Sequence, residues 1–417
     1  MRGRRAIALL LLLGILALVA GGLHRLRAPA PSTFYRAAAG LAPQHPAAFF
    51  SVDATAMPLV PERLLQALPE ETWRATRLAG WWAEPPLTPS GGTFLIELTE
   101  EPRAREDGWL WERVGRYWLL SRQAGEPSRS GLELRLDRFK RRDLVLWVDL
   151  TRWSGPPITP VGGGRLVMAG GRGPDGWLFD WFLETEQRLP SYALELETAD
   201  LVPASADRYG AVDLRLLGEL YPDGLRSVTR TLERREIRFE EVMDVLSGEM
   251  AFVEPPPELE EEPAGPRPAF LLFPTRQRAA VEDLIDRAFP PPVRTAESRR
   301  VHGTTLIRSF GRQLSFAVTD RFLVVGLEAD GAELEAWLDS SARRPLSETA
   351  GYRLLRDHLG SERPVVVTSW TLEGLTEQFP GLALSRAALE PGSRVWQAAV
   401  PEPGGLSGTL IVAGPGR

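Results

Sequence analysis

The chain repeats its own pattern, and this internal repeat constrains the fold more than any other feature of the sequence. The stretch that begins at Leu41–Pro43 continues through Phe49 to Val52-Asp53. The stretch that begins at Leu201–Pro203 continues through Tyr209 to Val212-Asp213 at the same spacing, without a gap. A single short match can arise by chance, so further matches in the same order are needed to establish a repeat.

Such matches follow along both stretches. They pair 78–80 with 246–248, 93–96 with 269–272, 115–120 with 320–325, 139–149 with 359–369, and 165–176 with 394–405. The distance between partners grows along the chain, as a tandem duplication with insertions in the second copy would produce. The sequence therefore predicts an anchor and spacer in 1–33, a first repeat domain in 34–200, and a second repeat domain in 201–417.

The second copy is the easier one to translate into secondary structure. Apolar residues at helical spacing predict one helix from Phe239 towards Gly248 and another that ends before Pro290. Runs of β-forming residues, joined by links too short for crossovers, predict antiparallel strands. The strands are expected at 249–253, 269–273, 305–310, 313–318, 322–326 and 365–370, and further helices near 332–338 and 347–359. We therefore expect an α+β fold: two tandem copies of a mostly antiparallel sheet with helices on one face.

An apolar run without charge extends from Ala6 to Leu23, with three arginines before it and two after it. As a helix it would be roughly 27 Å long, which is just enough to cross the hydrocarbon core of a bilayer. An uncleaved signal anchor fits this run better than a cleaved signal peptide, because the small residues of a cleavage site fit poorly. The slight excess of positive charge before the run predicts a cytoplasmic N-terminus. We expect a single-pass protein of the bacterial inner membrane, anchored by residues 6–23, with a stiff spacer at 28–32 and its bulk outside the cytoplasm.

Composition and motifs narrow the chemistry. The formal net charge is −6, so we expect no nucleic-acid partner. The chain has no cysteine, which excludes disulfides, thiolate metal sites and cysteine nucleophiles. The four histidines show no ligand spacing, and no catalytic or phosphate-binding motif occurs, so we expect no metal, no cofactor and no catalytic residue. Gly171–Gly176 matches a dinucleotide fingerprint by letter, but a turn followed by a strand-like segment predicts a hairpin there.

Two sets of acidic residues allow more than one interpretation. Asp53 and Asp213, which end the Val-Asp pairs, are expected to cap the helices that follow, and a ligand contact is the alternative. The proline-rich acidic segment 254–268 is expected to be an exposed mobile loop, and a docking segment for a basic partner is the alternative.

The tryptophans are concentrated in the first copy: ten of the thirteen lie before residue 182. Trp109 and Trp111 would share one face of a sheet, and so would Trp177 and Trp181. Core packing is one interpretation of these four residues. The other is an aromatic platform for sugar rings, lipid chains or a partner protein, which makes them a candidate partner surface.

The chain resembles a bacterial family of unknown function whose members carry an N-terminal membrane anchor and a duplicated extracytoplasmic domain. The residues that carry the resemblance are Leu201–Pro203, Val212-Asp213, Phe322–Gly326, and Pro345–Glu348 with Tyr352. The likeness is strongest over 201–375. It implies an architecture and no activity.

Three functions remain open. The first is a non-catalytic envelope protein that binds or scaffolds an envelope partner. The second is a binder of lipid or another hydrophobic ligand between helices and sheet. The third is an enzyme with an unrecognised site.

Overall fold

The computed structural model describes most of the chain from Thr33 onward. The described residues are 33–60, 62–85, 87–102, 108–122, 139, 143–152, 164–173, 176–185, 192–220, 222–256, 267–288, 297–301, 305–310, 313–374 and 392–414. The expected anchor at 6–23 and the expected spacer at 28–32 lie outside these ranges. Within them, no helix is both long enough and apolar enough to span a bilayer.

The chain divides into two compact units. The first contains the described residues from Thr33 to Thr185 and the C-terminal strand that follows Pro401. The second contains the described residues from Tyr192 to Gly374, together with Arg394–Val400. Strands pair antiparallel in both units, and helices pack against them, so the expected α+β class with antiparallel pairing is confirmed.

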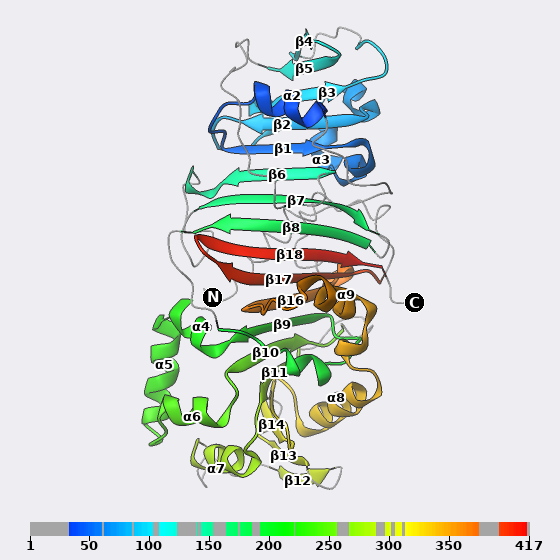
Figure 1. The fold of residues 1–417 in the computed structure, drawn as a ribbon. Coiled ribbons are helices and arrows are strands. Elements are labelled where there is room, and N and C mark those ends of the chain that lie inside the picture. Colours follow the sequence, from blue (N-terminus) through cyan, green and yellow to red (C-terminus); the bar gives the residue numbers. More distant parts are fainter. Residues whose placement is uncertain are drawn as a thin grey trace. The chain divides into compact units, whose positions relative to one another are not determined.

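The first unit is built on one antiparallel sheet. Its strands are β1 (Ala48–Val52), β2 (Arg77–Trp82), β3 (Thr93–Glu97), β4 (Leu110–Val114), β5 (Tyr117–Ser121), β6 (Leu144–Asp149), β7 (Arg165–Gly173), β8 (Gly176–Glu184) and β18 (Gly405–Ala413). The pairings run from β4 through β5, β3 and β2 to β1, and then through β6, β7 and β8 to β18 (Figure 1). Gly171–Gly176, which matches a dinucleotide fingerprint by letter, lies where β7 and β8 meet in a hairpin, as expected.

Short helices accompany this sheet. They are α2 (Thr33–Leu41), η1 (Ala54–Leu59), α3 (Glu62–Gln66), η2 (Glu70–Arg74), η3 (Pro89–Gly91) and η4 (Leu150–Arg152). On one face, Phe34 and Ala38 of α2 join a buried cluster with Phe49, Trp81 and Trp147. On the other face, the rings of Phe50, Trp82 and Phe94 pack together. Gly80 lies beneath these rings, where a Cβ would collide with Phe50 and Phe94, so the close ring packing requires glycine.

The second unit also has one antiparallel sheet. Its strands are β9 (Arg208–Asp213), β10 (Glu249–Glu254), β11 (Ala269–Pro274), β12 (Glu297–Val301), β13 (Thr305–Ser309), β14 (Leu314–Val318), β15 (Phe322–Leu327), β16 (Val366–Thr371) and β17 (Arg394–Glu402), the last of which leaves the unit after Val400. The pairings run from β12 through β13, β14, β15, β11 and β10 to β9, and then through β16 to β17. The strands expected between 249 and 370 are present as β10, β11 and β13–β16, and β12 was not expected from the sequence.

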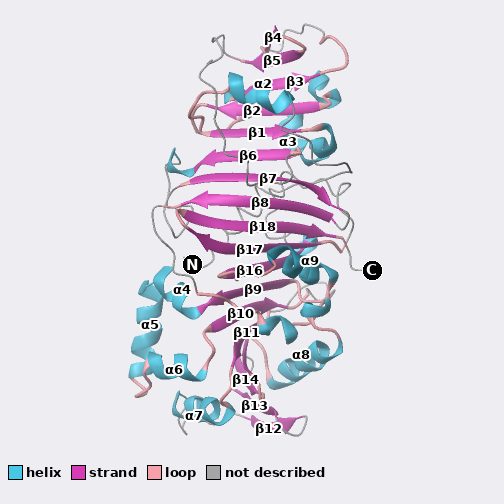
Figure 2. Ribbon diagram, in the orientation of Figure 1, coloured by secondary structure: helices cyan, strands magenta, loops and turns pink. Residues whose placement is uncertain are grey.

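The helices of the second unit are longer (Figure 2). They are η5 (Glu197–Asp200), α4 (Leu214–Leu220), α5 (Pro222–Glu233), α6 (Phe239–Val245), α7 (Arg278–Ala288), α8 (Gly331–Arg343), η7 (Leu346–Glu348) and α9 (Ala350–Leu359). The four expected helices correspond to α6, α7, α8 and the pair η7–α9. Asp330 begins α8 with a reciprocal capping box to Glu333.

The expectation that helices cover one face is wrong for the second unit. Val281 and Ile285 of α7 pack with Phe316 on one face. Trp337 of α8 stacks on Phe270 with ring centroids 4.8 Å apart, and the strand register puts Phe270 on the opposite face from Phe316. The reason is the sequence of strands such as β15, whose residues are apolar on both faces and so require cover on both.

Candidate functional site

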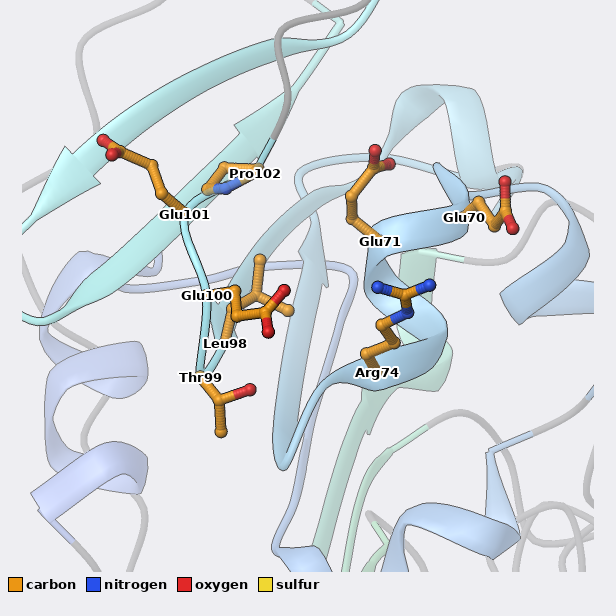
Figure 3. Close-up of a pocket in the computed structure, with 8 residues that line it drawn as sticks. All are labelled: Glu70, Glu71, Arg74, Leu98, Thr99, Glu100, Glu101 and Pro102. Carbon is orange, nitrogen blue, oxygen red and sulfur yellow. The ribbon is translucent and has the colours of Figure 1, made fainter.

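A charged surface cleft lies in the first unit, between η2 and the segment that follows β3. Its volume is about 150 Å³, large enough for a small polar group. The residues that line it are Glu70, Glu71, Arg74, Leu98, Thr99, Glu100, Glu101 and Pro102 (Figure 3). We refer to these residues as the acidic cleft.

One hydrogen bond within η2 and two between the residue after η2 and the end of β3 underlie the acidic cleft. The hydroxyl of Thr72, which is fully buried in η2, donates to the carbonyl of Pro69 at 2.6 Å. Just after η2, the backbone N–H of Thr76 donates to the carbonyl of Glu97 at the end of β3, at 3.0 Å, and its hydroxyl donates to the same oxygen. The position of the carboxylates is therefore set by the fold beneath them.

The chemistry of the acidic cleft favours contact with positive charge. It presents four carboxylates and one guanidinium, and Figure 3 shows Glu100 and Glu101 on the wall opposite Glu71 and Arg74. Carboxylates that remain near water accept hydrogen bonds from ammonium and guanidinium groups. Sequence reasoning did not find this site, because its residues come from a loop and a short 3₁₀ helix that show no periodic pattern.

One tryptophan stands beside the cleft on the same helix. Trp73 is 55% exposed, and its indole N–H donates to the carbonyl of Leu65 at 2.7 Å. Trp73 and Leu110 are the large hydrophobic side chains that stand out as exposed within the described ranges. Aromatic residues are enriched on protein-binding surfaces.

The four tryptophans named from the sequence are placed differently. Trp109, Trp177 and Trp181 are between 4% and 6% exposed, and Trp111 is half-buried. Trp177 stacks on Phe179, and Trp111 meets Trp118 edge to face. Side chains buried to this degree do not form a platform that a partner could contact, so core packing is the interpretation that describes Trp109, Trp177 and Trp181.

The Val-Asp pairs act as helix caps. Asp53 accepts a hydrogen bond from the backbone N–H of Ala54 at the start of η1. Asp213 accepts one from the N–H of Arg215 at 2.8 Å at the start of α4. Asp213 also forms an ion pair with the Arg215 guanidinium at 2.7 Å, and Asp53 forms one with Arg77. The expected structural role of both acids is therefore confirmed.

A buried carboxylate lies at the start of β10. Glu249 is 4% exposed, and its oxygens accept hydrogen bonds from the N–H of Leu196, the N–H of Thr198 and the hydroxyl of Thr198, at 2.8, 3.0 and 2.6 Å. Burial raises the pKa of Glu249, and the hydrogen bonds from Thr198 and Leu196 oppose that change. Burial also raises the pKa of Tyr209, whose hydroxyl lies 3.0 Å from that of Thr198. These contacts attach the segment that enters the second unit to its sheet.

A second buried group lies at the start of β17. Burial lowers the pKa of Arg394 to about 10, and the nearby Asp207 carboxylate opposes this shift. The Arg394 guanidinium donates to the Ser369 hydroxyl at 3.0 Å and to the carbonyls of Ala204 and Ala206. These partners are structural, since they belong to the backbone and to a neighbouring strand.

The remaining residues considered from the sequence do not form a second site in the described ranges. No group of three His, Asp or Glu side chains there is placed to share a metal ion. His45 and His358 are described, whereas His24, His302 and most of the acidic segment 254–268 lie outside the described residues.

Comparisons with known proteins add little. No family model matches the chain, and no curated protein matches it. Two solved structures of TP0453 are similar. Crystal form I is 15% identical, covers 54% of this chain and 81% of its own, and has a TM-score of 0.31. Crystal form III is 11% identical, covers 52% and 80%, and has the same TM-score. A likeness this weak carries no argument about fold or function.

Proposed function

We propose that this protein is a membrane-anchored, extracytoplasmic binding or scaffolding protein of the bacterial cell envelope, without catalytic activity, whose body consists of two copies of one α+β domain. The observation that carries this proposal is that both units connect their strands in the same order. In each, the first strand lies between the second strand and a late strand, and the late strand pairs with the next.

The strand registers support the duplication at positions on both sides of the first strand. The ungapped sequence match pairs Ser51 with Ala211. Stepping across the sheets from these two residues leads to two further pairs that the sequence also makes, Leu119 with Val324 and Ala169 with Ala398. In the first unit the steps are Ser51, Ala79, Leu95 and Leu119, and in the second they are Ala211, Ala251, Leu272 and Val324. Towards the other edge, Ser51 leads through Val145 to Ala169, and Ala211 leads through Val367 to Ala398.

The registers also shift three matches made from the sequence. They pair Leu95 with Leu272 in place of Leu271, and Val145 with Val367 in place of Val365. They also pair Leu78 with Met250. Leu78 lies opposite Val52 in the first unit, and Met250 lies opposite Val212 in the second. The sequence match had paired Leu78 with Leu246, which precedes β10. The helical segment between the first two strands has therefore diverged more than the strands.

The start of the first unit supports its attachment near a membrane. Phe34 of α2 is fully buried in the core, and ten residues separate it from Leu23, the last residue of the apolar run. Fully extended, a spacer of this length reaches about 35 Å. If residues 6–23 form the anchor, the first copy and its acidic cleft lie close to the membrane surface.

A binder of lipid or another hydrophobic ligand is the second candidate. Val212, Met250, Phe252 and Leu271 share one face of the second unit's sheet and are only half-buried. A half-exposed apolar sheet face is suited to an acyl chain.

Site-specific crosslinking in native membranes tests the proposal. A photoreactive residue at Glu71, in the acidic cleft, should capture an envelope protein, and the same residue at the exposed Asp357 on α9 should not. Charge reversal of Glu100 and Glu101 to lysine should remove the adduct. If both positions capture the same proteins, the cleft is not the contact surface. Recovery of bound lipid without any protein adduct would favour the second candidate.

The membrane topology has its own test. A reporter fused after the C-terminus should be active only when it lies outside the cytoplasm. Activity confined to the cytoplasm would overturn the orientation and, with it, the envelope role.

A further inference from the structure

The last strand of each proposed copy meets the other in the first unit. β8 and β18 pair antiparallel over nine residues each, from Gly176 opposite Ala413 to Glu184 opposite Gly405. At the centre of the pairing, the Thr409 hydroxyl donates to the Asp180 carboxylate at 3.0 Å. Phe179 and Leu410 lie opposite each other and are buried.

This pairing is symmetric in terms of the repeat. The sequence match equates Gly176 with Gly405 and therefore Asp180 with Thr409. The register places these two equivalent residues opposite each other. Each residue that lies a given number of positions after Asp180 is therefore opposite the residue that lies the same number of positions before Thr409. An antiparallel pair with this property has a local two-fold axis through Asp180 and Thr409.

Two glycines show the same symmetry at the two ends of the pairing. A Cβ on Gly176 would collide with the carbonyl oxygen of Val412. A Cβ on Gly405 would collide with the carbonyl oxygen of Leu183. Leu183 and Val412 are themselves equivalent in the repeat. The two ends of the pairing thus make the same close backbone approach, as the two halves of a symmetric dimer interface do.

We propose that the last strand of the repeat is a self-pairing edge, and that β8 with β18 is a homodimer interface held within one chain. The partner that β18 fits is a second copy of the same strand. This inference rests on the proposed duplication. An unpaired edge strand offers a row of free N–H and C=O groups to another chain, and fusion satisfies β18 internally because the tethered β8 is present at high effective concentration. Freed from β8, β18 should pair with β18 of a second chain about Thr409.

Wedge variants and introduced thiols test this in the full chain, which contains no other cysteine. Gly176→Val drives β8 away from β18 while leaving β18 unchanged. Combined with Thr409→Cys, it should give a disulfide-linked dimer. Gly405→Val separates the same two strands, but it also blocks the β18–β18 pairing, so combined with Thr409→Cys it should stay monomeric. Ser407→Cys in the Gly176→Val chain is the register control, because position 407 would face position 411 of the second chain and should not link to itself.

Each outcome has a distinct meaning. A monomeric Gly176→Val chain, or equal linking at 407 and 409, would overturn the self-pairing edge. An Asp180→Cys/Thr409→Cys chain should close an internal disulfide; if it does, the register stands whatever the wedge shows. If the wedge prevents folding, Thr409→Cys refolded from urea with a mild oxidant should form the dimer adduct at high protein concentration, and refolding at low concentration should form little of it. None of these results depends on an adduct at the acidic cleft, so the two proposals fail separately.

Discussion

The two units differ most clearly at one position that the proposed duplication would make equivalent, the first residue of the second strand. In the first unit this residue is Arg77, which forms ion pairs with Asp53 and Glu97 near the surface. In the second unit it is Glu249, which lies opposite the acid Asp213 and is buried. A basic residue completes a local ion pair in one unit, while an acid in the other accepts hydrogen bonds from a distant segment.

The difference shows that similarly placed strand residues can form different contacts in the two units. Asp213 obtains its positive partner from Arg215 on the following helix, so the strand residue opposite it is free to serve another purpose. The Glu249 carboxylate instead accepts hydrogen bonds from the backbone N–H groups of Leu196 and Thr198. Leu196 has a left-handed backbone, with φ of 61°, which a branched side chain adopts only when the surroundings hold it.

The largest effect is expected at this position. Glu249→Ala leaves buried donors of the second unit without an acceptor and should lower its unfolding free energy by about 3 kcal/mol. Arg77→Ala removes a partly exposed ion pair and should cost the first unit about 1 kcal/mol. Denaturant titration with hydrogen exchange, which assigns the loss to a unit, measures both. Equal losses would mean that the two positions are energetically alike.

A second comparison concerns Phe49 and Tyr209, which are equivalent and fully buried. Phe49→Tyr puts a hydroxyl into a cluster of buried apolar side chains and should cost about 2 kcal/mol. Tyr209→Phe removes the hydroxyl beside Thr198 and should cost about 1 kcal/mol. Thermal or chemical unfolding of the two variants tests the order, and a stabilised Phe49→Tyr chain would contradict it.

Removing the helix cap should also cost the second unit more stability than the first, and both losses should be smaller than that of Glu249→Ala. Asp213 is buried and bonded to both the backbone and the guanidinium of Arg215, so Asp213→Ala should cost about 2 kcal/mol. Asp53 is more exposed, so Asp53→Ala should cost about 1 kcal/mol. Replacement by asparagine, which can still cap, should recover part of each loss in the unfolding free energy.

The smallest effect is a dependence on pH. The folded pKa of Glu249 lies above the ordinary value of 4.5, so the folded chain binds this proton more tightly than the unfolded chain does. The stability that the protonated form contributes is fully present below pH 4.5 and is lost as the pH rises through the folded pKa. Glu249→Gln should therefore flatten the unfolding free energy of the second unit between pH 4.5 and neutrality relative to the parent chain. An unchanged slope would mean that Glu249 does not titrate in this window.

Local patterns were enough to predict much of the fold. Helical spacing around Val242 and Ile285 predicted α6 and α7, and β-rich runs predicted β10, β11 and β13–β16. The Val-Asp pairs predicted caps, because a carboxylate at a strand end can reach the next backbone N–H without help from the rest of the chain. These features depend on residues that are neighbours in sequence.

Long-range packing decided the rest. Trp177 and Trp181 share a strand face, as predicted, but whether that face meets solvent depends on elements far away in the sequence, and both are buried. The two walls of the acidic cleft lie side by side because β2, which follows η2, pairs with β3, and Thr76 hydrogen-bonds the end of β3. The burial of Glu249 depends on a segment some fifty residues earlier.

The sequence by itself therefore determined the class of fold and most strands and helices of the second unit. Periodicity and capping report the conformation of a short segment, and that conformation is set by nearby atoms. Only the tertiary structure decided which faces are covered, which charges are buried, and that Asp180 lies opposite Thr409. Burial and cross-strand register are set by contacts between segments that the order of residues does not place together.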